Sequence, residues 1–254
     1  VFQEIHRVLK PSGTVWLNLG DSYAGSNSDK YSAPNKNTLS AKMGQTYGGI
    51  EKSIKAKVHG LKPKDLIGIP WRVAFALQAD GWYLRSDIIW QKPNPMPESV
   101  KDRPTKSHEY IFLLTKSRKY YYDADAIKEP TVSQDKYKRD RDNPDYKFNN
   151  TPGRTKMSGL KDNKYTLKNK RDVWSINTKP YKEAHFAVFP EEIPMNCIKA
   201  GSPKDGVVLD PFAGSGTTLK VALGLGRKAI GIDINTEYLD LCIKRCNEIQ
   251  NILI

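Results

Sequence analysis

The sequence predicts an α/β fold in which a mostly parallel sheet is covered by helices on both faces. Strand-like runs alternate with amphipathic helical runs along most of the 254 residues, and this alternation is typical of parallel sheets with crossover helices. A second observation is the stretch LDPFAGSGTT at 209–218, where a strand leads into a glycine turn and then a helix. Two β-rich runs, at 83–92 and 109–117, add an antiparallel pair that we expect at a sheet edge.

The N-terminal half supplies two helices and three strands. Apolar residues at 2, 5, 8 and 9 lie on one helical face, and the run Pro-Ser-Gly ends this first helix. TVWLNLGD (14–21) follows as a short buried strand, and residues 24–60, rich in Ser, Asn, Gly and Lys, form a loop. PKDLIGIPWRVAFALQADGW (63–82) predicts a helix that ends near Gly81, just before the two β-rich runs.

The C-terminal part repeats helix and strand signals. PEEIPMNCIKAGS (190–202) predicts a helix with Gly201 past its end. Then come a buried parallel strand GVVLD (206–210), a helix TTLKVALGLG (217–226), a strand KAIGIDI (228–234) and a helix NTEYLDLCIKRCNEI (235–249). We therefore expect both strands to lie in a parallel sheet.

Composition excludes several classes of protein. With 38% hydrophobic and 27% charged residues the chain is expected to be globular, and no apolar run approaches the roughly 20 residues that span a bilayer. No cleavable signal pattern opens the chain. Cys197, Cys242 and Cys246 form no CxxC pair or His/Cys cluster, so neither a metal site nor a disulfide framework is expected. We expect a reducing, cytoplasmic setting and no membrane partner.

The net charge of +13 indicates a polyanionic partner, usually nucleic acid. The excess is concentrated between 133 and 171, where twelve Lys and Arg stand against five Asp. This stretch has little apolar periodicity, so a solvated loop is the alternative to a segment that follows DNA phosphates. The basic residues that we expect to contact DNA are Lys136, Lys138, Arg139 and Arg141.

The glycine turn and two acids predict a nucleotide-type site. Asp210 ends a strand where ligands of open α/β sheets bind, and Gly214 and Gly216 let the backbone approach a ligand. Thr217 begins a helix, and Asp233, 23 residues after Asp210, can accept both hydroxyls of a ribose. A GxG turn can serve NAD, FAD or S-adenosylmethionine, or simply packing. The missing third glycine and the acid in the turn favour the cationic S-adenosylmethionine.

DPFAGSGTT followed by GRKAIGIDINTEYLDLCIKR resembles the cofactor motif of β-class S-adenosylmethionine-dependent DNA amino-methyltransferases, the cytosine-N4 and adenine-N6 enzymes of restriction–modification systems and phages. RVLKPSGTVWLNLGDSYAG, the block from IPWRVAF to IFLLTKS, and DVWSINTKPYKEAHFAVFPEEI resemble other parts of that family. The resemblance implies a Rossmann-like methyltransferase fold with a circularly permuted motif order, a bacterial or phage-infected cell, and double-stranded DNA as partner. It also implies a catalytic-side half at 1–132, a basic target-recognition insertion at 133–172, and a cofactor half at 173–254.

The resemblance also implies a set of site residues. Those around the methionine end of S-adenosylmethionine are Asp210, Phe212, Gly214, Gly216 and Thr217. Asp233 would hold the ribose, with Ile234 beside the adenine. The element that closes over the methionine moiety comprises His185, Phe186, Phe189 and Pro190. Trp90 and Lys92 would face the target base, although simple core packing explains Trp90 equally well.

The chain departs from the family at the catalytic tetrapeptide, an Asp, Asn or Ser followed by Pro-Pro and an aromatic residue. No Pro-Pro dipeptide occurs in the sequence, so no catalytic residue is assigned. We expect that the sequence begins downstream of its true start and lacks one strand as well as this loop. The expected function is DNA methylation at an exocyclic amine of a flipped base, with cytosine-N4 slightly preferred over adenine-N6. An inactive S-adenosylmethionine- and DNA-binding module and a dinucleotide oxidoreductase are the alternatives.

Overall fold

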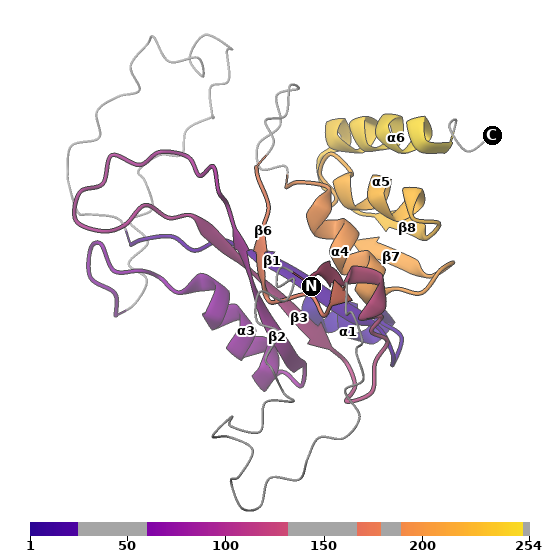
Figure 1. Cartoon of the computed structure of the whole chain (residues 1–254), viewed down its shortest axis with the longest axis horizontal. Helices are drawn as coiled ribbons and strands as arrows, with labels where there is room; N and C mark the ends of the chain where they lie inside the picture. Colours follow the sequence, from indigo (N-terminus) through magenta and orange to yellow (C-terminus); the bar gives the residue numbers. More distant parts are fainter. Residues whose placement is uncertain (25–59, 132–166, 179–188, 251–254) are drawn as a thin grey trace, which may run out of the picture. The chain divides into compact units, whose positions relative to one another are not determined.

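The computed structural model describes residues 1–24, 60–131, 167–178 and 189–250 (Figure 1). The chain divides into two compact units, each of which is described by itself. The first unit comprises Val1–Tyr120 and Val173–Thr178, and the second comprises Tyr121–Asp172 and Lys179–Ile254. The domain boundaries proposed from the sequence follow its motifs and its basic segment, and they stay predictions.

The first unit is built around a four-stranded sheet with the order β1–β3–β2–β6. Its elements, in chain order, are α1 (Phe2–Val8), β1 (Thr14–Leu19), α3 (Ile69–Ala79), β2 (Tyr83–Gln91), β3 (His108–Thr115) and β6 (Val173–Ser175). β3 pairs antiparallel with β1 and β2, whereas β6 pairs parallel with β2. The carboxyl ends of β1, β2 and β6 therefore lie at the same end of the sheet, where β3 begins; we call this end the carboxyl edge.

The two β-rich runs are confirmed as antiparallel neighbours, but their predicted place at a sheet edge is wrong. β2 and β3 occupy the inner positions of the described sheet, because β1 pairs on one side and β6 on the other. β6 was missed because its three residues include only one buried side chain, Trp174, and so short a run has no readable period. β1 lies at the edge and is half-buried along its length, not buried as predicted.

The apolar core of the first unit forms where α3 packs on β3. Phe112 and Leu114, both fully buried, point to the same face of β3 because they are two residues apart. Ala74 and Leu77 of α3 belong to the same cluster, and Ile5 of α1 packs against it. Two helices therefore cover one face of the sheet and leave its carboxyl edge available for polar side chains.

The second unit contains a parallel pair of strands with helices along it. Its elements are η1 (Asp125–Ile127), β4 (Glu129–Pro130), β5 (Leu167–Lys168), α4 (Glu192–Gly201), β7 (Val207–Asp210), α5 (Thr217–Gly224), β8 (Lys228–Gly231) and α6 (Thr236–Gln250). β7 pairs parallel with β8 from Val207 opposite Lys228 to Asp210 opposite Gly231. Their order confirms the predicted strand–helix–strand–helix succession.

Three details of the second unit differ from the sequence-based prediction. The strand at 206–210 was expected to be buried, yet Val207 and Leu209 are exposed, because only the alternate residues of β7 pack toward α4 and α5. Gly201 is the last residue of α4 and does not lie beyond it. β8 ends at Gly231, so Asp233 lies two residues past the strand. That offset allows Asp233 to reach the preceding glycine turn.

Within the described ranges, no helix is both long enough and apolar enough to cross a lipid bilayer. The same residues contain no group of three or more His, Cys, Asp or Glu side chains that could hold a metal ion.

Candidate functional site: the glycine turn and the polar end of the sheet

The turn between β7 and α5, residues 211–216, is organised by the acid that ends β7. Asp210 is the last residue of β7, as predicted, and its Oδ1 accepts a hydrogen bond of 3.0 Å from the backbone N–H of Phe212. Gly216 N–H donates to the carbonyl of Ala213 at 2.8 Å and closes the turn. The chain thus reverses directly at the carboxyl end of a parallel strand, where ligands of such sheets bind.

Asp233 is brought onto the same turn. Its Oδ2 accepts the N–H of Gly214 at 2.7 Å, and its Oδ1 accepts the N–H of Asn235 at 2.9 Å. Each carboxylate oxygen can accept more than one hydrogen bond, so the group that orders the turn is also suited to accept from a ribose. The structure therefore brings together the two acids that the sequence singled out.

Backbone hydrogen bonds continue the pairing past the two strands. Ile232 N–H donates to Asp210 C=O at 2.9 Å, and Ala213 N–H donates to Ile232 C=O at 2.9 Å. The first residues of the turn are therefore held against the segment that follows β8. A ligand at this edge would meet a turn that is already shaped.

Gly216 is required by both its conformation and its surroundings. Its φ of 78° lies in the left-handed region, which side chains rarely adopt. A Cβ built on Gly216 would stand 2.4 Å from Sγ of Cys242, which lies on α6 beneath the turn. Burial raises the pKa of the Cys242 thiol to about 11, with Cys246 adding to the shift. Cys242 is thus a small packing residue that fits against a glycine.

Apolar side chains flank the two acids. Phe212 is 69% exposed and Ile234 is fully exposed, so both present surface on which an adenine or a methylene chain could pack. Phe189 is half-buried and Pro190 is buried just before α4. His185 and Phe186 of the same predicted element lie outside the described residues.

The Thr217 side chain faces the protein. It is 3% exposed, and its Oγ1 accepts a hydrogen bond of 3.3 Å from Nη1 of Arg245 on α6. The same Nη1 donates to the carbonyl and the hydroxyl of Ser215. Sequence reasoning missed Arg245 and Ser215. The available signal was an arginine spaced three residues from Cys242 on the inward face of an amphipathic helix.

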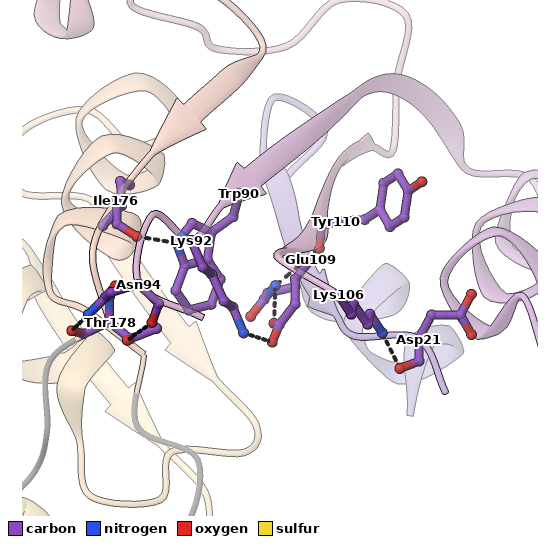
Figure 2. A network of polar contacts seen from close by, with 10 residues as sticks. Asp21, Trp90, Lys92, Asn94, Lys106, Glu109, Tyr110, Ile176 and Thr178 are labelled. Carbon is purple, nitrogen blue, oxygen red and sulfur yellow. Dashed lines mark hydrogen bonds and ion pairs between the residues drawn. The ribbon is translucent and has the colours of Figure 1, made fainter. Parts of the chain in front are cut away.

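A second group of polar side chains gathers at the carboxyl edge of the first unit's sheet (Figure 2). Lys92 follows β2 directly, and its ammonium forms an ion pair with Glu109 of β3. The other Glu109 oxygen accepts from Nδ2 of Asn18 in β1 at 3.1 Å. Side chains from three strands thus meet, and Lys92 and Glu109 remain 21% and 24% exposed. Lys92 was predicted to face the target base, which stays a prediction, whereas Glu109 was not singled out.

Trp90 lies beneath this group. It is 3% exposed, its indole Nε1 donates to the carbonyl of Ile176 at 2.9 Å, and the Lys92 ammonium lies 4.4 Å from its ring centroid. Of the two alternatives for Trp90, the structure favours core packing, with Trp90 supporting Lys92 from below. Asn94 also bonds to the segment after β6. Its Nδ2 donates to Thr178 C=O at 3.0 Å, and Thr178 N–H donates to Asn94 Oδ1 at 2.9 Å.

Asp21 and Lys106 stand beside the same edge. Oδ1 of Asp21 accepts the N–H groups of Gly68 and Ile69, both at 3.0 Å, and so satisfies free donors at the start of α3. The Lys106 ammonium donates to the Asp21 carbonyl. Burial lowers the pKa of Lys106, and the Asp21 and Glu109 carboxylates oppose that shift. These contacts fix the loop after β1 next to the polar edge.

The four basic residues predicted to contact DNA, Lys136, Lys138, Arg139 and Arg141, lie outside the described residues. Their role stays a prediction.

Comparison with known proteins gives a consistent result. A family described as DNA methylase matches residues 1–244. The type II methyltransferase M.SmaI of Serratia marcescens is 47% identical over 246 residues, which cover 96% of this chain and 71% of that protein.

Two solved structures show the same fold. The PvuII DNA methyltransferase (cytosine-N4-specific) matches with a TM-score of 0.60 at 16% identity, over 98% of this chain and 71% of that one. A putative DNA modification methylase of Thermus thermophilus, solved in complex with S-adenosyl-L-methionine, matches with a TM-score of 0.53 at 20% identity, over 98% and 74% of the two chains. The predicted Rossmann-like methyltransferase fold is confirmed.

Gly216→Ala should destabilise the protein by at least about 2 kcal/mol, because the new methyl group combines left-handed backbone strain with a clash against buried Cys242. Gly224→Ala is the matched control, since Gly224 ends α5 and a Cβ built on it meets nothing within 4 Å. That change should alter stability by less than about 1 kcal/mol. Urea unfolding followed by circular dichroism measures both; equal losses would contradict the packing argument.

Proposed function

Since the chain belongs to the family of S-adenosylmethionine-dependent DNA amino-methyltransferases, whose match spans residues 1–244, we propose that it serves methylation of the N4 amine of cytosine in double-stranded DNA. The observation that carries this proposal is the turn after β7, on which Asp210 and Asp233 converge. Adenine-N6 is the alternative target. Family membership removes the dinucleotide oxidoreductase from consideration.

The residues present fit S-adenosylmethionine, which supplies the methyl group when bound. The Asp233 carboxylate is suited to accept the ribose hydroxyls, and exposed Ile234 offers an apolar face for adenine. Asp210 places a carboxylate near the cationic methionine end, and Phe212 and Phe189 add apolar surface there. Opposite charges attract more strongly where the protein excludes water, so the acids favour this cofactor over an anionic dinucleotide.

The chemistry limits what the protein must do. The exocyclic amine of a base is a weak nucleophile because its lone pair is delocalised into the ring. Such an amine needs groups that accept its hydrogens and hold it in line with the methyl group, so positioning and electrostatics supply the rate. In the family this is the task of the tetrapeptide with Pro-Pro, which the 254 residues do not contain. We expect these residues alone to bind cofactor and DNA with little turnover.

The polar edge of the first unit is the proposed place for the base. Lys92 and Glu109 present a donor and an acceptor side by side, each about a quarter exposed. The edge of cytosine that carries N4 offers a donor and a ring acceptor, so the two patterns are complementary. A base can reach these side chains only when it is turned out of the duplex. Adenine offers the same pair of groups at N6 and N1, and the preference for cytosine therefore rests on the likeness of NLGDSY at 18–23 to the cytosine enzymes.

DNA methylation is tested in cells that carry the gene encoding this chain together with its upstream sequence. Sequencing-based detection of modified bases should find N4-methylcytosine at one recognition sequence. N6-methyladenine would instead establish the alternative target. Absence of both, with the protein present at normal levels, would leave the binding module as the surviving hypothesis.

Cofactor binding should depend on Asp233. Asp233→Ala removes the ribose acceptor and leaves the Gly214 N–H without its carboxylate partner, so S-adenosylmethionine binding should weaken by roughly 1–3 kcal/mol. Asp240→Ala, an exposed acid on α6, serves as the control and should bind normally. Isothermal titration calorimetry measures each affinity. Unchanged affinity in both Asp233→Ala and Asp210→Ala would remove the site from this turn.

DNA affinity should fall steeply with salt if the segment 133–171 follows phosphates, with a log–log slope of about −0.9 per phosphate contacted. Reversing the charges of Lys136, Lys138, Arg139 and Arg141 together should flatten that slope. The control reverses four exposed lysines elsewhere: Lys10, Lys119, Lys204 and Lys228. Fluorescence anisotropy across a salt series measures the slopes. If both quadruple variants behave alike, the segment is a solvated loop.

A further inference from the structure

A largely buried arginine stands behind the glycine turn at residues 211–216. The Arg245 side chain is only 12% exposed, although α6 is a surface helix with several exposed charges. Its Nη1 donates to the Ser215 carbonyl at 2.7 Å, to the Ser215 hydroxyl at 2.8 Å and to the Thr217 hydroxyl at 3.3 Å. One nitrogen of one side chain therefore reaches three acceptors of the turn and of the first residue of α5.

Burying a guanidinium is expensive unless hydrogen bonds replace its water. On α6 an apolar residue would pack beside Cys242 without that cost, so packing alone does not explain an arginine at this position. What the arginine adds is a set of charge-assisted hydrogen bonds, which are stronger and more directional than neutral ones. All three of the bonds above act on residues 215–217.

The peptide between Ser215 and Gly216 is the group that these bonds hold. Its N–H, on Gly216, donates to Ala213 C=O at 2.8 Å, and its C=O, on Ser215, accepts from Arg245. Both ends of one peptide are thus fixed. Rotation of this peptide depends on the ψ angle of Ser215 and the φ angle of Gly216, and Gly216, whose φ is 78°, has the conformational freedom of a residue without a side chain. Loss of Arg245 removes the hydrogen bond that holds the carbonyl of this peptide, so the peptide would rotate more easily.

The other terminal nitrogen of Arg245 lies near an acid of another helix. Its Nη2 lies 3.9 Å from Oε1 of Glu191, the residue immediately after Pro190, and the same oxygen accepts from Lys220 at 2.9 Å. Glu191 is the N-cap residue of α4. Arg245 therefore contacts both the glycine turn and the end of the Phe189–Pro190 segment.

We propose that Arg245 is a positioning residue for S-adenosylmethionine: it holds the Ser215–Gly216 peptide in its binding conformation and, through Glu191, sets the Phe189–Pro190 segment against the same turn. The proposal rests on the proposed function only in placing the cofactor at this turn. Arg245 acts through the backbone and does not touch the reacting atoms.

The test compares variants in which the contacts are removed, partly kept or left intact. Arg245→Met removes the charge while keeping an unbranched chain, and it should raise the dissociation constant for S-adenosylmethionine about tenfold, or about 1.4 kcal/mol. Arg245→Lys should recover part of the affinity, because one ammonium can reach Ser215 but cannot also present a planar fork toward Glu191. Lys244→Met, an exposed neighbour on α6, is the control and should bind like the unchanged protein.

A merely structural role would give a different result. It would lower the melting temperature of the free protein, while calorimetry well below that temperature would still find an unchanged dissociation constant. The proposal requires the opposite result. Arg245→Met should bind S-adenosylmethionine more weakly although circular dichroism shows it to be folded, and Arg245→Lys should recover part of the affinity. Glu191→Gln combined with Arg245→Met should cost less than the two single changes together, since both remove the same contact.

The outcomes distinguish failure of the proposed cofactor site from failure of the proposed role of Arg245. If the unchanged chain does not bind S-adenosylmethionine, the cofactor site itself is misplaced. If it binds and Arg245→Met binds equally well, only the role of Arg245 is overturned. Should Arg245→Met fail to fold, Ser215→Ala and Arg245→Lys decide, because each removes part of the same hydrogen-bond set; normal affinity in both would overturn the inference.

Discussion

The hydrogen bond from Gly214 N–H to the Asp233 carboxylate is the interaction on which the arrangement of the turn after β7 depends. It joins the turn that follows β7 to the segment that follows β8, and it adds to the backbone hydrogen bonds that extend the strand pairing as far as Ala213. The other Asp233 oxygen holds Asn235 N–H just before α6 begins. Because α6 carries Cys242 and Arg245, one carboxylate sets the turn and the helix that supports it from below.

Much of this turn could be predicted from the sequence, and the reasons are local. A strand, a closely spaced glycine pair and a helix start define the turn, so Asp210 and Gly216 were predicted where they lie. The place of Asp233 beyond β8 was not predicted, since hydropathy carries the strand pattern on to Ile234 whereas β8 ends at Gly231. Arg245 was missed because its partners are about thirty residues away along the chain, and helix periodicity reports burial but not the acceptors that make burial of a charge tolerable.

In the first unit, too, features that depend on neighbouring residues were predicted, and features that depend on residues far apart in the sequence were not. β2 and β3 were recognised because each is long and apolar, whereas their inner position depends on β1 and on the three residues of β6, which lie far apart in sequence. Lys92 was selected from a motif, but its partner Glu109 belongs to an antiparallel strand whose register decides the contact. For Trp90 the motif left two interpretations, and the bond from its indole to Ile176, a contact with a distant segment, is what favours core packing. Side-chain pairing across a sheet needs register, which composition does not contain.

The polar contacts around the turn after β7 share one physical consequence. Asp210, Asp233 and Arg245 all bind backbone or hydroxyl groups of the protein itself, so the conformational freedom of the turn is already lost when the chain folds. A ligand that then binds need not order this backbone, and rigid, prepared groups convert more of their contact energy into affinity. The apolar side chains of Phe212 and Ile234 differ from these polar groups because they are exposed to solvent. Their burial under a ligand can still contribute to the free energy of binding. The charged groups and the exposed apolar side chains would therefore contribute differently to binding. The prearranged charged groups would orient a ligand, and the apolar side chains would add hydrophobic free energy when the ligand covers them.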